Sequence, residues 1–220
     1  QLAAFDPPFE IPLPGLLRGL AGQLSPDVVA TAAWVEEREG QKPVNPRHGN
    51  LGKHYRYRIR ATVLRDPCRR RVEWHLGQRL DVGLMGRAGQ AFVGTHDFAG
   101  FRASDCQAST TVRTITAVTF ETLEKNDVGP PGDPGRLSLG GGGRGPGHPG
   151  GADVVLAHVL GQAFLKNMVR IMVGTLVEVG LGKRAVDSIP DLLAHPDRRR
   201  SGVTAPAQGL TLVEVRWPTG

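Results

Sequence analysis

Residues 53–63 alternate between two kinds of side chain, a pattern that a β-strand divides between the two faces of a sheet. The two rows are Tyr55, Tyr57, Ile59 and Ala61, and His54, Arg56, Arg58 and Arg60. Residues 112–123 alternate in the same way, and residues 154–160 predict a third strand. The pattern therefore requires a sheet with one apolar face that other elements must cover.

Helical periodicity supplies those elements. Residues 163–179 are mostly apolar and predict a long buried helix that ends at Gly180. Shorter helices are predicted at 13–24, 81–93 and 186–194, and further strands at 2–5, 28–35 and 210–217. The mixture predicts an α+β fold with a largely antiparallel mixed sheet flanked by helices. Residues 126–152 are rich in Gly and Pro and predict a flexible insertion between two strands.

The charge and the cysteines narrow the class of protein. The net charge of +6 fits a polyanionic partner such as a nucleic acid, although an arginine-rich composition would produce the same excess. Cys68 and Cys106 lie far apart, so neither a disulfide framework nor a zinc site is expected. No apolar run is long enough to span a bilayer, and no phosphate-binding glycine motif is present. A cytoplasmic location without membrane contact is the expectation.

Arg170 stands out because it lies within the apolar stretch of 163–179. At helical spacing, Lys166, Asn167, Arg170 and Gly174 share one stripe. A guanidinium drawn into such a helix requires an anion, because an unpaired buried charge is costly. That anion would be a catalytic carboxylate, a phosphate, or the partner in a structural ion pair; alternatively, the side chain would extend to solvent.

Two other segments carry polar chemistry. Tyr55 would either pack in the core or stack on a base beside a cleft, and the basic row of the same strand would follow phosphates or face solvent. In residues 94–102, His96 and Asp97 suggest an acid/base pair. A turn capped by Asp97 above two packed phenylalanines is the favoured interpretation, because adjacent turn residues seldom face one target.

Taken together, these segments resemble the tRNA pseudouridine synthase A family. The matching segments follow the family's order along nearly the whole chain, and they are residues 1–5, 20–28, 45–57, 94–102, 164–174 and 204–210. The last three correspond to the family patterns G-x-H-D-F-x-x-F, F-L-x-x-M-V-R-x-x-V-G and A-P-A-x-G-L. Ala21 and Ser25 depart from the family pattern, which has Asn and Pro there.

The resemblance implies an isomerase that converts uridine to pseudouridine in the tRNA anticodon stem-loop without a metal or an organic cofactor. It implies the pseudouridine synthase fold, with residues 1–78 as the remainder of an N-terminal lobe and 79–220 as a similar C-terminal lobe. Tyr55 would stack on the flipped uracil and help to remove its C5 proton, and Arg170 would pair with the catalytic aspartate. By the same resemblance Arg47, Arg56 and Lys166, with Tyr55, would bind the substrate. Family members form homodimers that hold tRNA.

The family's catalytic aspartate lies in a G-R-T-D-x-G-V-H segment, which the alignment of motifs would place just before Gln1. The 220 residues contain no counterpart of it, and Asp6 falls on the wrong element. The expectation is therefore an enzyme whose first segment is outside this sequence, so that this chain alone would be inactive. The alternatives are a catalytically dead RNA-binding remnant and a small α+β structural protein with incidental charge.

Overall fold

The computed structural model describes residues 2–7, 9–35, 46, 49–123 and 154–218. Two compact units are present: residues 1–50 with 218–220, and residues 51–217. The predicted insertion at 126–152 lies outside the described residues. In the described part, no helix is long and apolar enough to cross a membrane.

The smaller unit contains α1 (Leu13–Gln23), which begins after Pro12. Proline suits the first turn of a helix because the amide it lacks would have no partner there. The leucine spacing thus predicted this helix correctly. The strands predicted at 2–5 and 28–35 were wrong: neither segment is a strand, because neither has a partner strand among the described residues.

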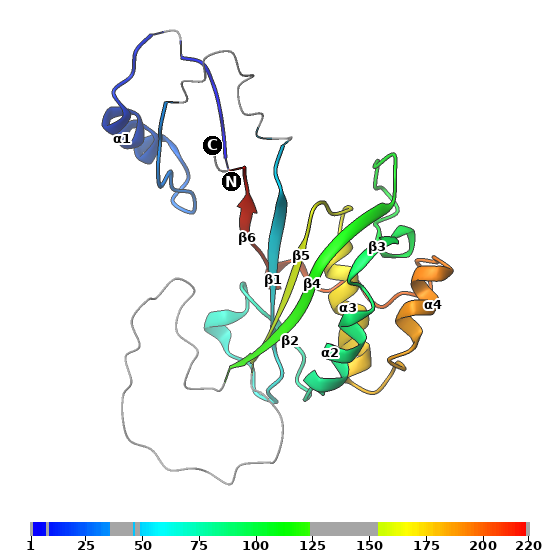
Figure 1. Ribbon diagram of the computed structural model, residues 1–220. Helices are drawn as coiled ribbons and strands as arrows, with labels where there is room; N and C mark the ends of the chain where they lie inside the picture. Colours follow the sequence, from blue (N-terminus) through cyan, green and yellow to red (C-terminus); the bar gives the residue numbers. More distant parts are fainter. Residues whose placement is uncertain (1, 8, 36–45, 47–48, 124–153, 219–220) are drawn as a thin grey trace. The chain divides into compact units, whose positions relative to one another are not determined.

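The larger unit is a six-stranded sheet with helices on one face (Figure 1). The strand order is β2-β1-β5-β4-β3, with β6 also paired to β1. Every pairing is antiparallel except β1 with β2. The strands are β1 (Gly52–Arg60), β2 (Trp74–His75), β3 (Gly94–Asp97), β4 (Val112–Leu123), β5 (Val154–Gly161) and β6 (Leu210–Arg216). The predicted α+β class and largely antiparallel sheet are confirmed.

Three helices complete this unit: α2 (Val82–Gln90), α3 (Met168–Gly180) and α4 (Ser188–Ala194). Asp81 caps α2, since its carboxylate accepts a hydrogen bond from the Leu84 amide at 2.8 Å. Helix α3 starts at Met168, five residues later than predicted from the apolar run. The apolar run therefore located the helix but not its first residue.

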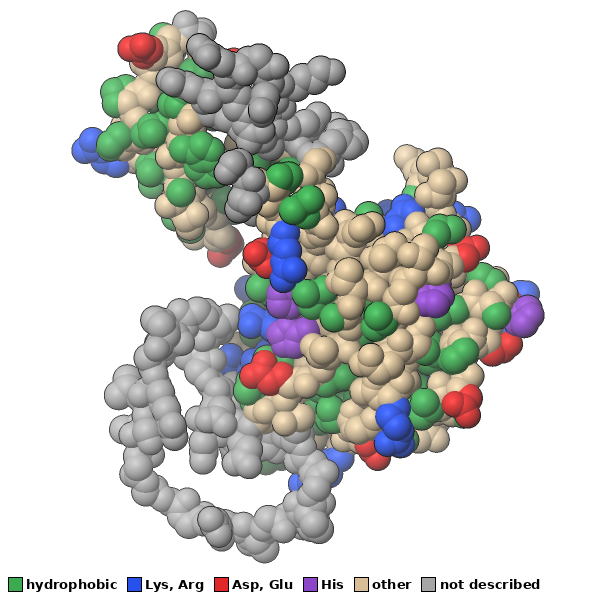
Figure 2. Space-filling model, in the orientation of Figure 1, with side chains coloured by type: hydrophobic (Ala, Val, Ile, Leu, Met, Phe, Trp, Pro, Cys, Tyr) green, Lys and Arg blue, Asp and Glu red, His purple; other side chains and the backbone are tan. Residues whose placement is uncertain are grey.

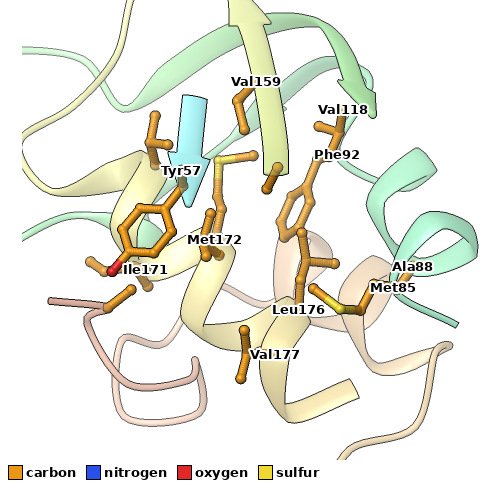
Figure 3. Packing of buried hydrophobic residues seen from close by; sticks show 14 of the residues in the cluster. Tyr57, Met85, Ala88, Phe92, Val118, Val159, Ile171, Met172, Leu176 and Val177 are labelled. Atoms are coloured by element: carbon orange, nitrogen blue, oxygen red, sulfur yellow. The ribbon is translucent and has the colours of Figure 1, made fainter. Parts of the chain in front are cut away.

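The core lies between the sheet and helices α2 and α3 (Figure 3). Tyr57, Ile59 and Val159 supply the sheet side, and Met172 and Leu176 of α3 are fully buried against it. Burying each such side chain stabilises the fold by about 1.5–3 kcal/mol. The apolar row of β1 therefore packs into the core, as its alternation predicts. Within that core Tyr57 lies beside Ile171, near the start of α3 (Figure 3).

Candidate functional site

The two tyrosines of β1 have different surroundings. Tyr57 is fully buried, and its hydroxyl donates a 2.5 Å hydrogen bond to the Pro206 carbonyl. Tyr55 is half-buried, and its ring meets the edge of Phe164 with centroids 5.1 Å apart. Its hydroxyl has no hydrogen-bond partner among the described residues. Tyr57 therefore has a structural role, and Tyr55 is the partly exposed tyrosine of the two.

Burial raises the pKa of the Tyr55 phenol above its ordinary value. The phenol of Tyr55 is accordingly neutral near pH 7, because its ordinary pKa of about 10 is already well above that pH. A neutral aromatic ring can stack on a base and donate one hydrogen bond.

Arg170 lies in the first turn of α3 and is half-buried. Its Nε donates to the Ala205 carbonyl at 2.6 Å, and its Nη1 donates to the Asn167 Oδ1 at 3.0 Å. Its Nη2 has no partner among the described residues. The guanidinium is therefore held along one side by neutral oxygens and keeps an unused donor edge. That edge suits a carboxylate or a phosphate, which guanidinium groups bind with two parallel hydrogen bonds.

The segment 203–209 contacts both Arg170 and Tyr57. Ala205 accepts from Arg170, and Pro206 accepts from Tyr57. Two glycines allow this close packing: a Cβ on Gly209 would lie 2.6 Å from Cζ of Tyr57, and a Cβ on Gly174 would overlap the Val203 carbonyl. The start of α3, strand β1 and this segment thus form one packed unit around Arg170.

Lys166 does not belong to the predicted helical stripe. It is exposed in the turn before α3, where its ammonium bonds to the Asp105 carboxylate. That hydrogen bond lowers the pKa of Asp105. The Ala103 amide also donates to the Lys166 carbonyl at 3.0 Å. The stripe was wrong for Lys166, because the chain turns at Asn167 before it becomes helical and Lys166 is held by the loop of Ala103 and Asp105. Asn167 and Arg170 do lie together, as predicted.

In the basic row on the other face of β1, some side chains bond to other described residues and one does not. Arg58 and Arg60 both bond to the Glu73 carboxylate, and Arg60 and Glu73 are buried. These two arginines are structural, contrary to both predicted roles for the row. Arg56 is half-buried and has no hydrogen-bond or ion-pair partner among the described residues. Arg47 lies outside the described residues.

His54 completes that row. Its Nε2 lies 2.9 Å from Nδ1 of His158 on β5, and Figure 2 shows histidine side chains together at this place on the surface. Burial and then the neighbouring His158 lower the pKa of His54. His54 is therefore neutral near pH 7, because its ordinary pKa of about 6.5 already lies below that pH.

The turn interpretation of residues 94–102 is confirmed. The Asp97 carboxylate accepts from the Ala99 amide at 2.9 Å, and Phe98 and Phe101 are fully buried beneath. His96 Nε2 donates to the Val93 carbonyl at 3.0 Å. Strand β3 was missed because four residues are too few for a clear alternation.

Comparison with known proteins gives these features a context. Residues 88–218 match the family model described as tRNA pseudouridine synthase. The tRNA pseudouridine synthase A of Myxococcus xanthus is 39% identical over 220 residues, covering 100% of this chain and 71% of that protein. The protein of the same name from Geotalea uraniireducens (strain Rf4) is 41% identical over 215 residues, covering 98% of this chain and 75% of that protein.

This chain belongs to the tRNA pseudouridine synthase A family. The part that matches the family model contains Arg170 and the segment that holds it. Tyr55 lies before that part but within the region aligned with the Myxococcus xanthus relative. The sequence patterns predicted no role for Phe164, Asn167, Ala205 and Pro206. The only sequence signal for these residues is that the motifs at 164–174 and 204–210 follow each other in the family's order. That order does not predict that the two motifs are in contact, or that the carbonyls of Ala205 and Pro206 accept hydrogen bonds.

Proposed function

We propose that the protein converts uridine to pseudouridine in the anticodon stem-loop of tRNA, with Tyr55 and Arg170 in its active site. The observation that carries the proposal is the state of Arg170: neutral oxygens hold one side of its guanidinium, and none of the described residues uses the Nη2 edge. Such an arrangement serves an anion that arrives from elsewhere. Family membership supports the identity of that anion as the catalytic aspartate.

In this reaction the glycosidic bond from N1 to C1′ breaks, the uracil rotates, and a bond from C5 to C1′ forms. The C5 proton is then lost and N1 gains a proton, so the atoms balance without any other reactant. The uridine must first leave its base stack, because its glycosidic bond is otherwise inaccessible. The half-buried ring of Tyr55, beside Phe164, suits a partner on which the displaced uracil stacks.

The raised pKa of Tyr55 refines its role. A phenol that resists ionisation is a poor base for the C5 proton, but it still stacks and donates a hydrogen bond. We therefore place Tyr55 as a stacking and orienting group. Arg170 orients and stabilises the aspartate as a carboxylate, because a nearby cation favours the ionised form.

Contacts with the rest of the tRNA belong to the proposal as well. Arg56, which bonds to none of the described residues, would meet a phosphate, Lys166 would exchange its contact with Asp105 for one, and Arg47 completes the set. Neutralising phosphates makes affinity fall with added salt. A homodimer of two-lobed subunits, divided as residues 1–78 and 79–220 and working in the cytoplasm, is the expected assembly.

The test uses the full gene product and a tRNA transcript with tritium at C5 of its uridines. Tritium release into water reports the exchange of the C5 proton. Arg170→Lys keeps the charge but loses the planar fork, so kcat should fall about 10²–10³-fold. Arg199→Lys is the matched control, since Arg199 is an exposed arginine whose side chain, among the described residues, pairs only with Asp197. Equal kcat for the Arg170 variant and the wild type would refute the role of Arg170.

The second candidate is an RNA-binding protein without activity. It is favoured if the full gene product binds tRNA with a steep salt dependence yet releases no tritium. In that case the Arg170→Lys change should alter the affinity for tRNA, and neither protein should release tritium. Absence of both binding and turnover would leave only the structural alternative.

A further inference from the structure

Asn167 has an unusual backbone conformation and an unusual hydrogen bond. Its φ of 61° and ψ of 5° are left-handed, and it is the only non-glycine residue with positive φ in the described part of the chain. It also stands at the N-cap of α3, where an asparagine normally accepts a hydrogen bond from the first turn of the helix. Its side chain makes no such capping bond.

The side chain of Asn167 instead binds Arg170. Its Oδ1 accepts a 3.0 Å hydrogen bond from Nη1, while the Ala205 carbonyl accepts from Nε of the same guanidinium. Two acceptors from different segments therefore fix the plane of the guanidinium. The backbone supports this geometry, because the Asn167 carbonyl accepts from the Ile171 amide at 3.0 Å and the Ala205 amide donates to the Arg170 carbonyl at 3.1 Å.

From this geometry we infer that Asn167 is a positioning residue, which holds Arg170 so that its Nη2 edge faces the catalytic carboxylate. This inference rests on the proposed function of Arg170. An arginine side chain has many rotamers, and a fork that is oriented beforehand loses less entropy when its partner binds. A neutral acceptor is required, because an anion at the position of Oδ1 would compete with the carboxylate for the same guanidinium.

The left-handed turn alone does not require asparagine. Glycine adopts this conformation with less strain, so a turn without a side-chain role would accept glycine at no loss. Asparagine tolerates the conformation and in addition supplies an acceptor. The exchange Asn167→Gly therefore separates the two roles: it preserves the turn and removes the hydrogen bond to Arg170.

The first experiment compares Asn167→Gly and Asn167→Asp with the wild-type full gene product in the tritium-release assay. We expect Asn167→Gly to lower kcat about 10- to 100-fold, in the range found when a supporting hydrogen bond is lost. KM and the melting temperature should change little. Asn167→Asp should lower kcat further, because its carboxylate pairs with Arg170. Wild-type kcat for Asn167→Gly would overturn the inference.

A second measurement does not depend on turnover. In ¹⁵N NMR spectra the guanidinium NH₂ groups of Arg170, assigned by their loss in Arg170→Lys, should be resolved in the wild type, because the bond to Asn167 slows their rotation. In Asn167→Gly these NH₂ signals should merge into one, because the rotation is no longer slowed. Identical spectra would overturn the inference, whatever the kinetics. If the wild type has no turnover, the proposed function fails, and the spectra alone decide whether Asn167 positions Arg170.

Discussion

Gly174→Ala tests whether the segment 203–209 and α3 are packed as closely as the candidate site requires. An added Cβ would meet the Val203 carbonyl at well under the 3.0 Å that real Cβ atoms keep, and it would lie 3.4 Å from Cγ2 of the same residue. The obstacle is backbone, so no change of rotamer relieves it. Either α3 or the segment must move, and Val203 is only two residues from the carbonyl that holds Arg170.

Two opposing terms set the size of the effect. Alanine is favoured over glycine inside a helix by roughly 1 kcal/mol. Overpacking a core costs typically about 1–3 kcal/mol and occasionally more; with a backbone carbonyl as the obstacle we take roughly 2–4 kcal/mol, which leaves a net loss of stability of roughly 1–3 kcal/mol. In a domain of this size that corresponds to a fall in melting temperature of roughly 2–12 °C.

The assay is urea unfolding followed by circular dichroism, with a thermal melt as a second measure. The matched control is Gly86→Ala in α2, where an added Cβ has no atom within 4 Å. This control should be as stable as the wild type or more stable by up to about 1 kcal/mol. If both variants gain stability, α3 is not in close contact with Val203, and the account of how Arg170 is held fails with it.

Three further predictions concern stability. Glu73→Gln removes the carboxylate that Arg58 and Arg60 share and should cost about 3–5 kcal/mol in urea unfolding; a loss below about 1 kcal/mol, typical of an exposed pair, would contradict a buried cluster. Tyr57→Phe removes a buried hydrogen bond to the Pro206 carbonyl and should cost about 0.5–1.5 kcal/mol, whereas the same change at Tyr55, whose hydroxyl bonds to none of the described residues, should cost less. Because the pKa of His54 is lowered on folding, the unfolded chain takes up its proton first, and stability should fall as pH drops below 6.5. His54→Asn should flatten that part of the pH profile, and an unchanged profile would show that His54 is not the cause.

Much of the architecture follows from local patterns. The alternation at 53–63 and 112–123 predicted β1 and β4, because a period of two leaves one apolar face that must be covered, although β1 ends at Arg60, three residues earlier than predicted. The apolar run before Gly180 predicted α3, and its apolar residues form the helical half of the core. The motifs at 164–174 and 204–210, in family order, pointed to the family that the comparisons confirm.

Local sequence patterns could not predict which distant segments come into contact. Arg58 and Arg60 have the spacing of a solvent-facing row, and only the position of Glu73 beside them makes them structural. The helical wheel placed Lys166 beside Arg170, but the left-handed turn at Asn167 separates them. Periodicity reports which face of an element is apolar. The partner of a charged or polar group depends instead on which remote segment the fold brings within hydrogen-bond distance, as Ala205 is brought to Arg170.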